Sequence, residues 1–183
     1  MRTTLLTAAL IATAGMAQAQ QANPTVGGAP MFAEKTIAEN ASAAPNLTTL
    51  VTAVSEAGLV ETLMGPGPFT VFAPTNAAFG RISDASLAAL LQNKPQLTQI
   101  LTCHVVAAEA FSSTIAGMIA DGGGAHQVET VGGCTLTAYM QGGKIKIRDE
   151  NGRVATVTTA DVDQSNGVVH VIDRVLLPAG QAG

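Results

Sequence analysis

The feature that most limits the fold of this chain is a change of hydrophobic period near His126. Before it, apolar residues recur at helical spacing, as in residues 47–54. After it, residues 134–140 alternate between apolar and polar, and glycine-containing pairs separate short runs of this kind. A helical half followed by a strand-rich half predicts an α+β fold rather than alternating βαβ units.

The same patterns place the individual elements. We expect helices over residues 46–57, 59–64, 75–79, 83–91, 95–101 and 112–121. Their expected N-caps are Asn46, Thr75, Ser83 or Asp84, and Ser112 or Ser113. Residues 69–73 are expected to form a buried strand, and residues 168–171 and 175–177 to form late buried strands.

The first twenty residues have the pattern of a secretory signal peptide. Arg2 gives a positive start, residues 5–15 are mostly apolar, and Ala17-Gln18-Ala19 fits the small-x-small cleavage rule. Cleavage is predicted after Ala19; the alternative is a buried N-terminal helix. We expect residues 1–19 to be this signal, residues 20–36 a flexible tail and residues 37–179 the folded domain, in the periplasm or the medium.

Charge and hydropathy exclude some classes of partner. The formal net charge is −4 at pH 7, which argues against nucleic acid as a partner. No later run is long enough for an integral membrane anchor.

Cys103 and Cys134 are the two cysteines of the chain. In an oxidising compartment an even pair predicts a disulfide. By the chain-entropy formula, a disulfide that closes the loop 103–134 stabilises the folded protein by roughly 3.7 kcal/mol, if native strain is ignored. The alternative is two buried free thiols.

Three motifs resemble one known family. Phe69-Thr-Val-Phe-Ala-Pro-Thr-Asn-Ala-Ala-Phe79 resembles the first signature of fasciclin-like domains, and Gly167-Val-Val-His-Val-Ile-Asp-Arg-Val-Leu-Leu-Pro178 resembles the second. Between them, Leu101-Thr-Cys-His-Val-Val106 lies where the family usually has a Tyr-His pair before two valines. The motifs occur in the family's order, so the chain is identified as a fasciclin-like domain.

The resemblance implies a wedge of about seven strands with a cluster of short helices, and a role in adhesion or extracellular interaction. It implies no shared reaction or cofactor. Cys103 replaces the family's tyrosine, so a receptor-contacting role is not carried over to it, and His104 inherits that role only weakly. We interpret Cys103 instead as one half of a disulfide that ties the helical half to the strand half.

Most residues of the first signature have a structural interpretation. Phe69, Phe72 and Phe79 are expected to be apolar anchors. The turn Pro74-Thr75-Asn76 either satisfies free helix N–H groups or contacts a ligand, and turn residues more often do the former.

His104 and His170 lie within apolar runs, and we expect hydrogen-bonded, half-buried imidazoles there. Asp173 is a candidate acceptor for N–H groups of the Pro74–Asn76 turn. The three histidines lack ligand spacing, so neither a metal site nor a cofactor is expected.

Lys144, Lys146 and Arg148 alternate with isoleucines, so a strand would place all three charges on one face. The simpler interpretation is a solvated outer face. The more specific interpretation is that the three charges form a cationic strip that binds an anionic envelope polymer. The neighbouring acidic residues Asp149 and Glu150 argue against this interpretation.

The chain carries no nucleophile elbow, zinc-protease motif or phosphate-binding loop, so we expect no enzyme. The leading hypothesis is an exported module for cell adhesion or for association with the envelope or matrix, through a protein or polysaccharide partner or self-association. The alternative is a periplasmic carrier of a small apolar ligand held between helices and sheet, and a hydrolase ranks below both.

Overall fold

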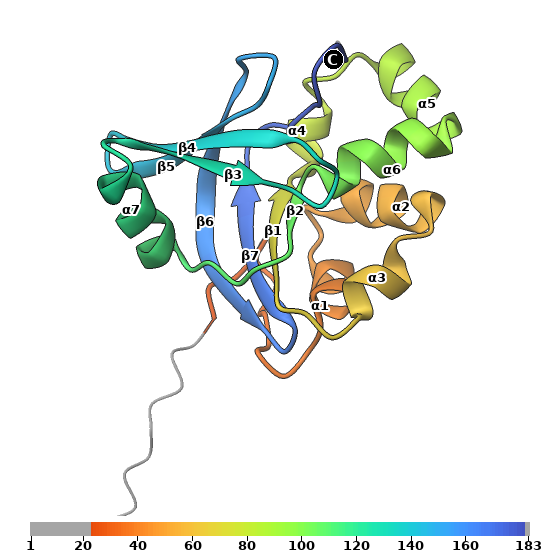
Figure 1. Cartoon of the computed structure of the whole chain (residues 1–183). Coiled ribbons are helices and arrows are strands. Elements are labelled where there is room, and N and C mark those ends of the chain that lie inside the picture. The colour runs from red at the N-terminus through yellow and green to blue at the C-terminus, as the bar shows by residue number, and fades with distance from the viewer. Residues whose placement is uncertain (1–22, 182–183) are drawn as a thin grey trace, which may run out of the picture.

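A computed structural model describes residues 23–181, and within that range the chain forms seven helices and one seven-stranded sheet (Figure 1). The predicted signal peptide lies outside the described residues. The helices are α1 (Ile37–Ala43), α2 (Thr48–Ala57), α3 (Val60–Met64), α4 (Asn76–Phe79), α5 (Asp84–Gln92), α6 (Lys94–Thr102) and α7 (Ser112–Asp121). The strands are β1 (Phe69–Pro74), β2 (Val105–Val106), β3 (Ala125–Glu129), β4 (Thr135–Gln141), β5 (Lys144–Arg148), β6 (Val154–Gln164) and β7 (Gly167–Ile172). The expected α+β class, with about seven strands and short helices, is confirmed.

The sheet has the strand order β2-β1-β7-β6-β5-β4-β3. Its one parallel pair joins β1 to β7, in register from Phe69 opposite Gly167 to Pro74 opposite Ile172. The strands approach so closely at the start of this pair that a Cβ on Gly167 would lie 2.0 Å from the carbonyl oxygen of Phe69. The two motifs that carry the family resemblance are therefore neighbouring strands.

Two apolar clusters fill the interior. Helices α1, α2, α3, α5 and α6 gather on one side of β1 and β7, and α7 lies by β3 and β4 (Figure 1). The first cluster joins the gathered helices to β1 and β7, with Leu97 and Phe79 among its members. The second packs α7 against β4, β5 and β6, with Leu136 and Ile147 at its centre. This division follows from the sequence, since the helical half supplies most of the first cluster and the alternating half most of the second.

The predicted helix caps are confirmed where the capping residue directly precedes its helix. The Thr75 hydroxyl accepts a hydrogen bond from Ala78 N, and the Ser83 hydroxyl accepts one from Ser86 N, as expected. The prediction that Asn46 caps α2 is wrong. The N-cap residue is Leu47, whose side chain makes no capping hydrogen bond.

The start of α7 is capped from another strand. Neither Ser112 nor Ser113 is its N-cap, so that expectation is also wrong. Instead the Asp161 carboxylate, on a bulge of β6, accepts hydrogen bonds from Ser112 N (2.6 Å) and from the Ser112 hydroxyl. Asp161 has a φ of 58°, a left-handed conformation that Asp tolerates better than most residues.

Two segments near the ends of the folded region differ from expectation. Val26 and Met31 are buried in the first cluster, so the ordered part begins before Ile37. Residues 175–177 are buried but form no strand. They are held from the β5–β6 turn, where Asp149 Oδ2 accepts a hydrogen bond from Leu177 N at 3.1 Å.

Cys103 and Cys134 form the predicted disulfide, with their Cα atoms 5.4 Å apart. The bond joins the end of α6 to the residue before β4. Gly132 permits this approach, because a Cβ there would lie 2.8 Å from Cys103 N. The helical and strand halves are thus covalently tied.

Replacing Asp161 should show that it caps α7 from a distance. Asp161→Ala removes the carboxylate and places alanine at positive φ, so we expect a loss of about 1–3 kcal/mol of unfolding free energy in urea denaturation. Asp161→Asn keeps an acceptor and tolerates this φ, so its loss should be smaller. Asp163→Ala, on the same strand, is the control; equal losses in all three variants would contradict the cap.

Breaking the disulfide should destabilise the domain by up to about 3.7 kcal/mol, because the unfolded chain regains the freedom of the loop 103–134. Guanidinium denaturation with and without reductant measures this loss. The Cys103→Ser/Cys134→Ser double variant should match the reduced protein and ignore reductant. Free thiols detected by mass spectrometry in the unreduced, exported protein would refute the bond.

Candidate functional site

The turn Pro74-Thr75-Asn76 uses its polar groups inside the fold. Thr75 N donates to Ile172 O at 3.2 Å. Asn76 Oδ1 accepts from Thr49 N at 3.0 Å, and Asn76 Nδ2 donates to the Thr48 hydroxyl at 2.9 Å. Asn76 is therefore the side chain that caps α2, a role that no local signal around residue 48 could have revealed.

Asp173 does not serve the turn as expected. Its Oδ1 accepts a hydrogen bond from Thr156 N at 2.7 Å, and its own N–H donates to Thr156 O. The expected partner was wrong because Asp173 continues the β6–β7 ladder instead of turning toward β1.

His170 is buried in β7 and fully engaged. Its Nε2 lies 2.8 Å from Ala110 O, its Nδ1 accepts from Asp161 N at 3.3 Å, and its ring stacks on Phe72. Burial lowers the pKa of His170, against smaller raising effects of the Ala110 carbonyl and Asp161. Ser112, Asp161 and His170 are thus neighbours, but the serine bonds to the aspartate and not to the imidazole, so they form no nucleophile–base pair.

His104 lies between α6 and β2, more deeply than expected, and only 2% of its surface is exposed. Its Nδ1 donates to Ile100 O at 2.8 Å, and its Nε2 accepts from Leu176 N at 2.9 Å. Both roles need the neutral ring. Burial lowers the pKa of His104 to about 4, although the Ile100 carbonyl and Asp149 act in the opposite direction.

Three cations line the outer face of β5. Lys144 and Arg148 are exposed and Lys146 is half-buried, whereas the two isoleucines between them are buried. Lys146 Nζ donates to the Thr156 hydroxyl at 2.7 Å, and the Arg148 guanidinium lies 5.0 Å from the ring centroid of Tyr139. We call Lys144, Lys146, Arg148 and Tyr139 the basic face.

The acidic residues that follow β5 form no ion pair with Lys144, Lys146 or Arg148 within the described residues. Asp149 is buried, pairs with Arg153 Nε at 3.1 Å and accepts hydrogen bonds from backbone N–H groups. Both carboxylate oxygens of Glu150 accept backbone N–H groups, of Thr135 and Ala179. Asp173, across from Thr156, is engaged as described above.

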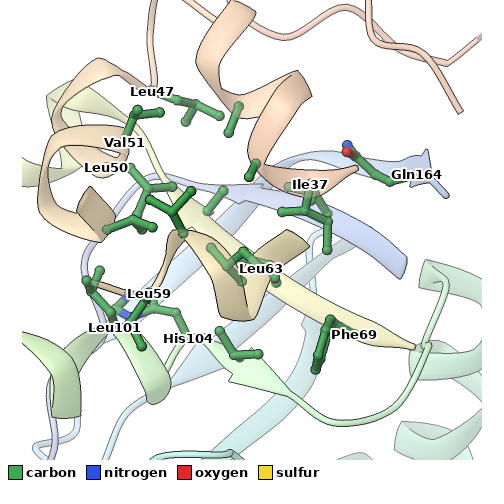
Figure 2. A pocket seen from close by; sticks show the side chains of 18 of the residues that line it. Ile37, Leu47, Leu50, Val51, Leu59, Leu63, Phe69, Leu101, His104 and Gln164 are labelled. Atoms are coloured by element: carbon green, nitrogen blue, oxygen red, sulfur yellow. The ribbon is translucent and has the colours of Figure 1, made fainter. Parts of the chain in front are cut away.

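A second candidate site is an apolar cavity of about 100 Å³ between the first three helices and the sheet (Figure 2). The side chains of Leu50, Leu63 and Phe69 surround it from α2, α3 and β1. Almost all of its wall is aliphatic. Its lining residues are Val26, Met31, Ile37, Ala38, Ala41, Ser42, Leu47, Leu50, Val51, Val54, Leu59, Val60, Thr62, Leu63, Phe69, Val71, Ala73, Leu101, Thr102, His104, Val105, Val131, Val162, Gln164 and Val169.

One amide lies in this apolar wall. Gln164 is 6% exposed, and its Oε1 accepts a hydrogen bond from Asn40 Nδ2 at 2.9 Å. Asn40 is itself oriented by Phe32, whose N–H donates to its Oδ1 and whose carbonyl accepts from its Nδ2. The sequence analysis named neither amide, because only the fold brings residues 40 and 164 together.

The residues that the sequence analysis singled out do not form one common site. The Pro74–Asn76 turn and His170 serve the fold, His104 forms part of the cavity wall, and the basic face lies on β4 and β5. Among residues 23–181 no cluster of His, Cys, Asp and Glu could hold a metal ion. In the same range no helix has the length and apolarity needed to cross a membrane.

Acid should destabilise the protein through His104. Between pH 6.5 and about 4 the unfolded chain binds a proton that the folded protein excludes, so stability falls as the pH is lowered through this window, by up to about 3 kcal/mol. His104→Gln can keep both hydrogen bonds without titrating. In urea denaturation at pH 7, 5.5 and 4.5, the free energy of unfolding of this variant should depend less on pH than that of the wild type. His170 should leave a smaller remaining dependence on pH. His126→Gln is the control, and an unchanged slope in His104→Gln would contradict the assignment.

The sequence model of the fasciclin domain family matches residues 45–178. "Protein sll1483" of Synechocystis sp. is 43% identical over 145 residues, which cover 78% of this chain and 73% of the relative. "Immunogenic protein MPB70" of Mycobacterium bovis is 36% identical over 171 residues, covering 90% of this chain and 80% of the relative. "Cell surface glycolipoprotein MPB83" of the same species is 37% identical over 173 residues, which cover 91% of this chain and 72% of the relative.

The fold has a solved counterpart. A FAS1 domain pair from the insect cell adhesion molecule fasciclin I superposes with a TM-score of 0.70 at 18% identity. The match covers 78% of this chain and 51% of that chain, so this chain spans about half of the solved pair. The sequence motifs, the seven-stranded sheet and these matches agree, and the chain belongs to the fasciclin domain family.

Proposed function

We propose that this protein is an exported interaction module that binds an acidic polymer of the cell surface or matrix through its basic face. The observation that carries the proposal is the solvent-facing row of Lys144, Lys146 and Arg148 on a chain whose net charge is −4. The predicted signal peptide supports export. The names of MPB83 as a cell surface glycolipoprotein and of fasciclin I as a cell adhesion molecule support a role outside the cell.

The chemistry of the face suits a polysaccharide bearing carboxylate or other acidic groups. The cations supply charge, and Tyr139, paired across the sheet with Lys146, supplies a flat apolar ring next to them. Asp149 pairs with Arg153, and Glu150 accepts two backbone N–H groups, so neither carboxylate is paired with the cations of the basic face. Contacts of this exposed kind are individually weak, so several are needed at once along a repeating polymer.

A second function, carriage of a small apolar ligand, is favoured by one specific observation. The cavity between α1, α2, α3 and the sheet is apolar and about 100 Å³ in size. Such a space holds hydrocarbon more readily than water, because water needs two to four polar partners.

Retention of the exported chain, residues 20–183, on the envelope fraction and exopolysaccharide of the producing cells tests the first function. Polygalacturonate beads serve as a defined acidic polymer. We expect saturable retention at 50 mM salt that disappears near 1 M, because the screening length shrinks to about 3 Å. Lys144→Gln/Lys146→Gln/Arg148→Gln should lower retention at least tenfold.

The matched control is Lys35→Gln/Arg81→Gln/Lys94→Gln, which removes three exposed cations away from the basic face. It has the same net charge as the first variant, so general electrostatics affect both equally. If the two variants lose retention to the same extent, the basic face is not the binding surface. Retention that survives 1 M salt would rule out a charge-based contact.

A further inference from the structure

The cavity wall shows what kind of ligand it accepts. No Lys, Arg, Asp or Glu lines it within residues 23–181. Within the same residues, the one ionisable group in the wall is His104, whose neutral form is favoured by its burial and accepts the Leu176 N–H at Nε2. A charged group inside would therefore lose its hydration without gaining a counter-charge, at a cost of several kcal/mol. The part of the ligand that enters must be uncharged.

The size of the cavity limits how much of a ligand enters. An engineered cavity of about 150 Å³ with a similar aliphatic lining stays dry and binds benzene. The cavity here, at about 100 Å³, is smaller. It therefore fits the end of a single chain better than a fused ring system.

The small side chains of α1 create part of this space. Ile37, Ala38, Ala41 and Ser42 form one stripe of the helix, at the spacing of a single helical face, and all four line the cavity. The two alanines leave room that larger residues would occupy. On β1, Ala73 has the same effect.

The rim of the cavity reaches solvent. Ser42, Thr62 and Val131 line it and are also exposed, Val131 to 51%. An entering chain can therefore leave the part that the cavity does not hold in water at the rim. Val131 belongs to the turn before Cys134, so the disulfide holds this edge of the opening in place.

The amide of Gln164 adds one polar requirement. Its Oε1 is used by Asn40, and within residues 23–181 no hydrogen bond of its Nε2 is found. An amide donor in an apolar wall, on a residue that is only 6% exposed, gains most from an uncharged oxygen acceptor. A hydroxyl or carbonyl oxygen on the chain would supply one.

We propose that the cavity between α1, α2, α3 and the sheet binds the end of a linear hydrocarbon chain that carries an uncharged oxygen, with Gln164 Nε2 donating to that oxygen. The assignment rests on the second function proposed above and is independent of the basic face. A fatty alcohol and an isoprenoid alcohol share this chemistry.

The test uses the full exported chain and the uncharged, linear fluorescent probe 1,6-diphenyl-1,3,5-hexatriene. The probe should bind, and n-decanol and farnesol should displace it; the stronger competitor identifies the acyl or isoprenoid source. Butanol should compete at least tenfold less well than decanol. Ala41→Leu fills the cavity and should weaken both the probe and decanol at least tenfold, whereas Ala88→Leu, on the exposed side of α5, should change either by less than twofold.

Gln164→Met keeps the length of the side chain and removes its donor. It should weaken decanol about tenfold more than it weakens the probe, which has no oxygen. Circular dichroism confirms folding, and Ala38→Leu replaces Ala41→Leu if the latter is unfolded.

The outcomes separate the claims. If the wild type binds neither probe nor decanol, carriage of an apolar ligand is excluded. Binding that is indifferent to Ala41→Leu and Ala38→Leu would place the ligand outside this cavity. Equal effects of Gln164→Met on probe and decanol would overturn the role of the amide.

Discussion

The parallel pairing of β1 with β7 is the contact on which the rest of this fold depends. The two strands are almost a hundred residues apart in sequence, and both are buried along nearly their whole length. β2 adds to the free edge of β1, and β6 adds to the free edge of β7, so the pair links β2 to the antiparallel strands β6, β5, β4 and β3. The close approach at Gly167 explains why a glycine begins the second motif, since any side chain there would meet the Phe69 carbonyl.

Sequence patterns predicted what is decided locally. Hydrophobic period predicted α2 to α7 and the change to strands, but it did not predict α1. Thr75 and Ser83 cap the helices that follow them directly in the chain. The two failures of capping have one physical cause. Asn76 caps α2 and Asp161 caps α7, and these acceptors come from segments that only the tertiary fold brings to the helix ends. The same reason hid Gln164, whose partner Asn40 is 124 residues away.

The cavity is a consequence of how the first helices are docked. Asn166, in the β6–β7 turn, accepts a hydrogen bond from Ile37 N at 3.0 Å and donates to Leu63 O at 2.8 Å and to Gly65 O at 3.0 Å. Asn40 and Gln164 form a second polar tie between α1 and β6. Directional bonds at the helix ends fix α1 and α3 without requiring dense packing between them and the sheet. A helix held in this way can carry Ala38 and Ala41 on its inner face and leave space there.

The cavity and the basic face lie close together in sequence but are mechanically separate. Val131 lines the cavity mouth, and four residues later β4 begins, which carries Tyr139 to the basic face. Coupling between two sites requires an element with two arrangements that both ligands bias. The connecting turn has little freedom of this kind, because the disulfide ties Cys134 to Cys103, and Val131 N and Gly132 N donate to the carbonyls of Val105 and Thr102. In the oxidised protein, a ligand in the cavity and a polymer on the basic face should therefore bind independently of one another.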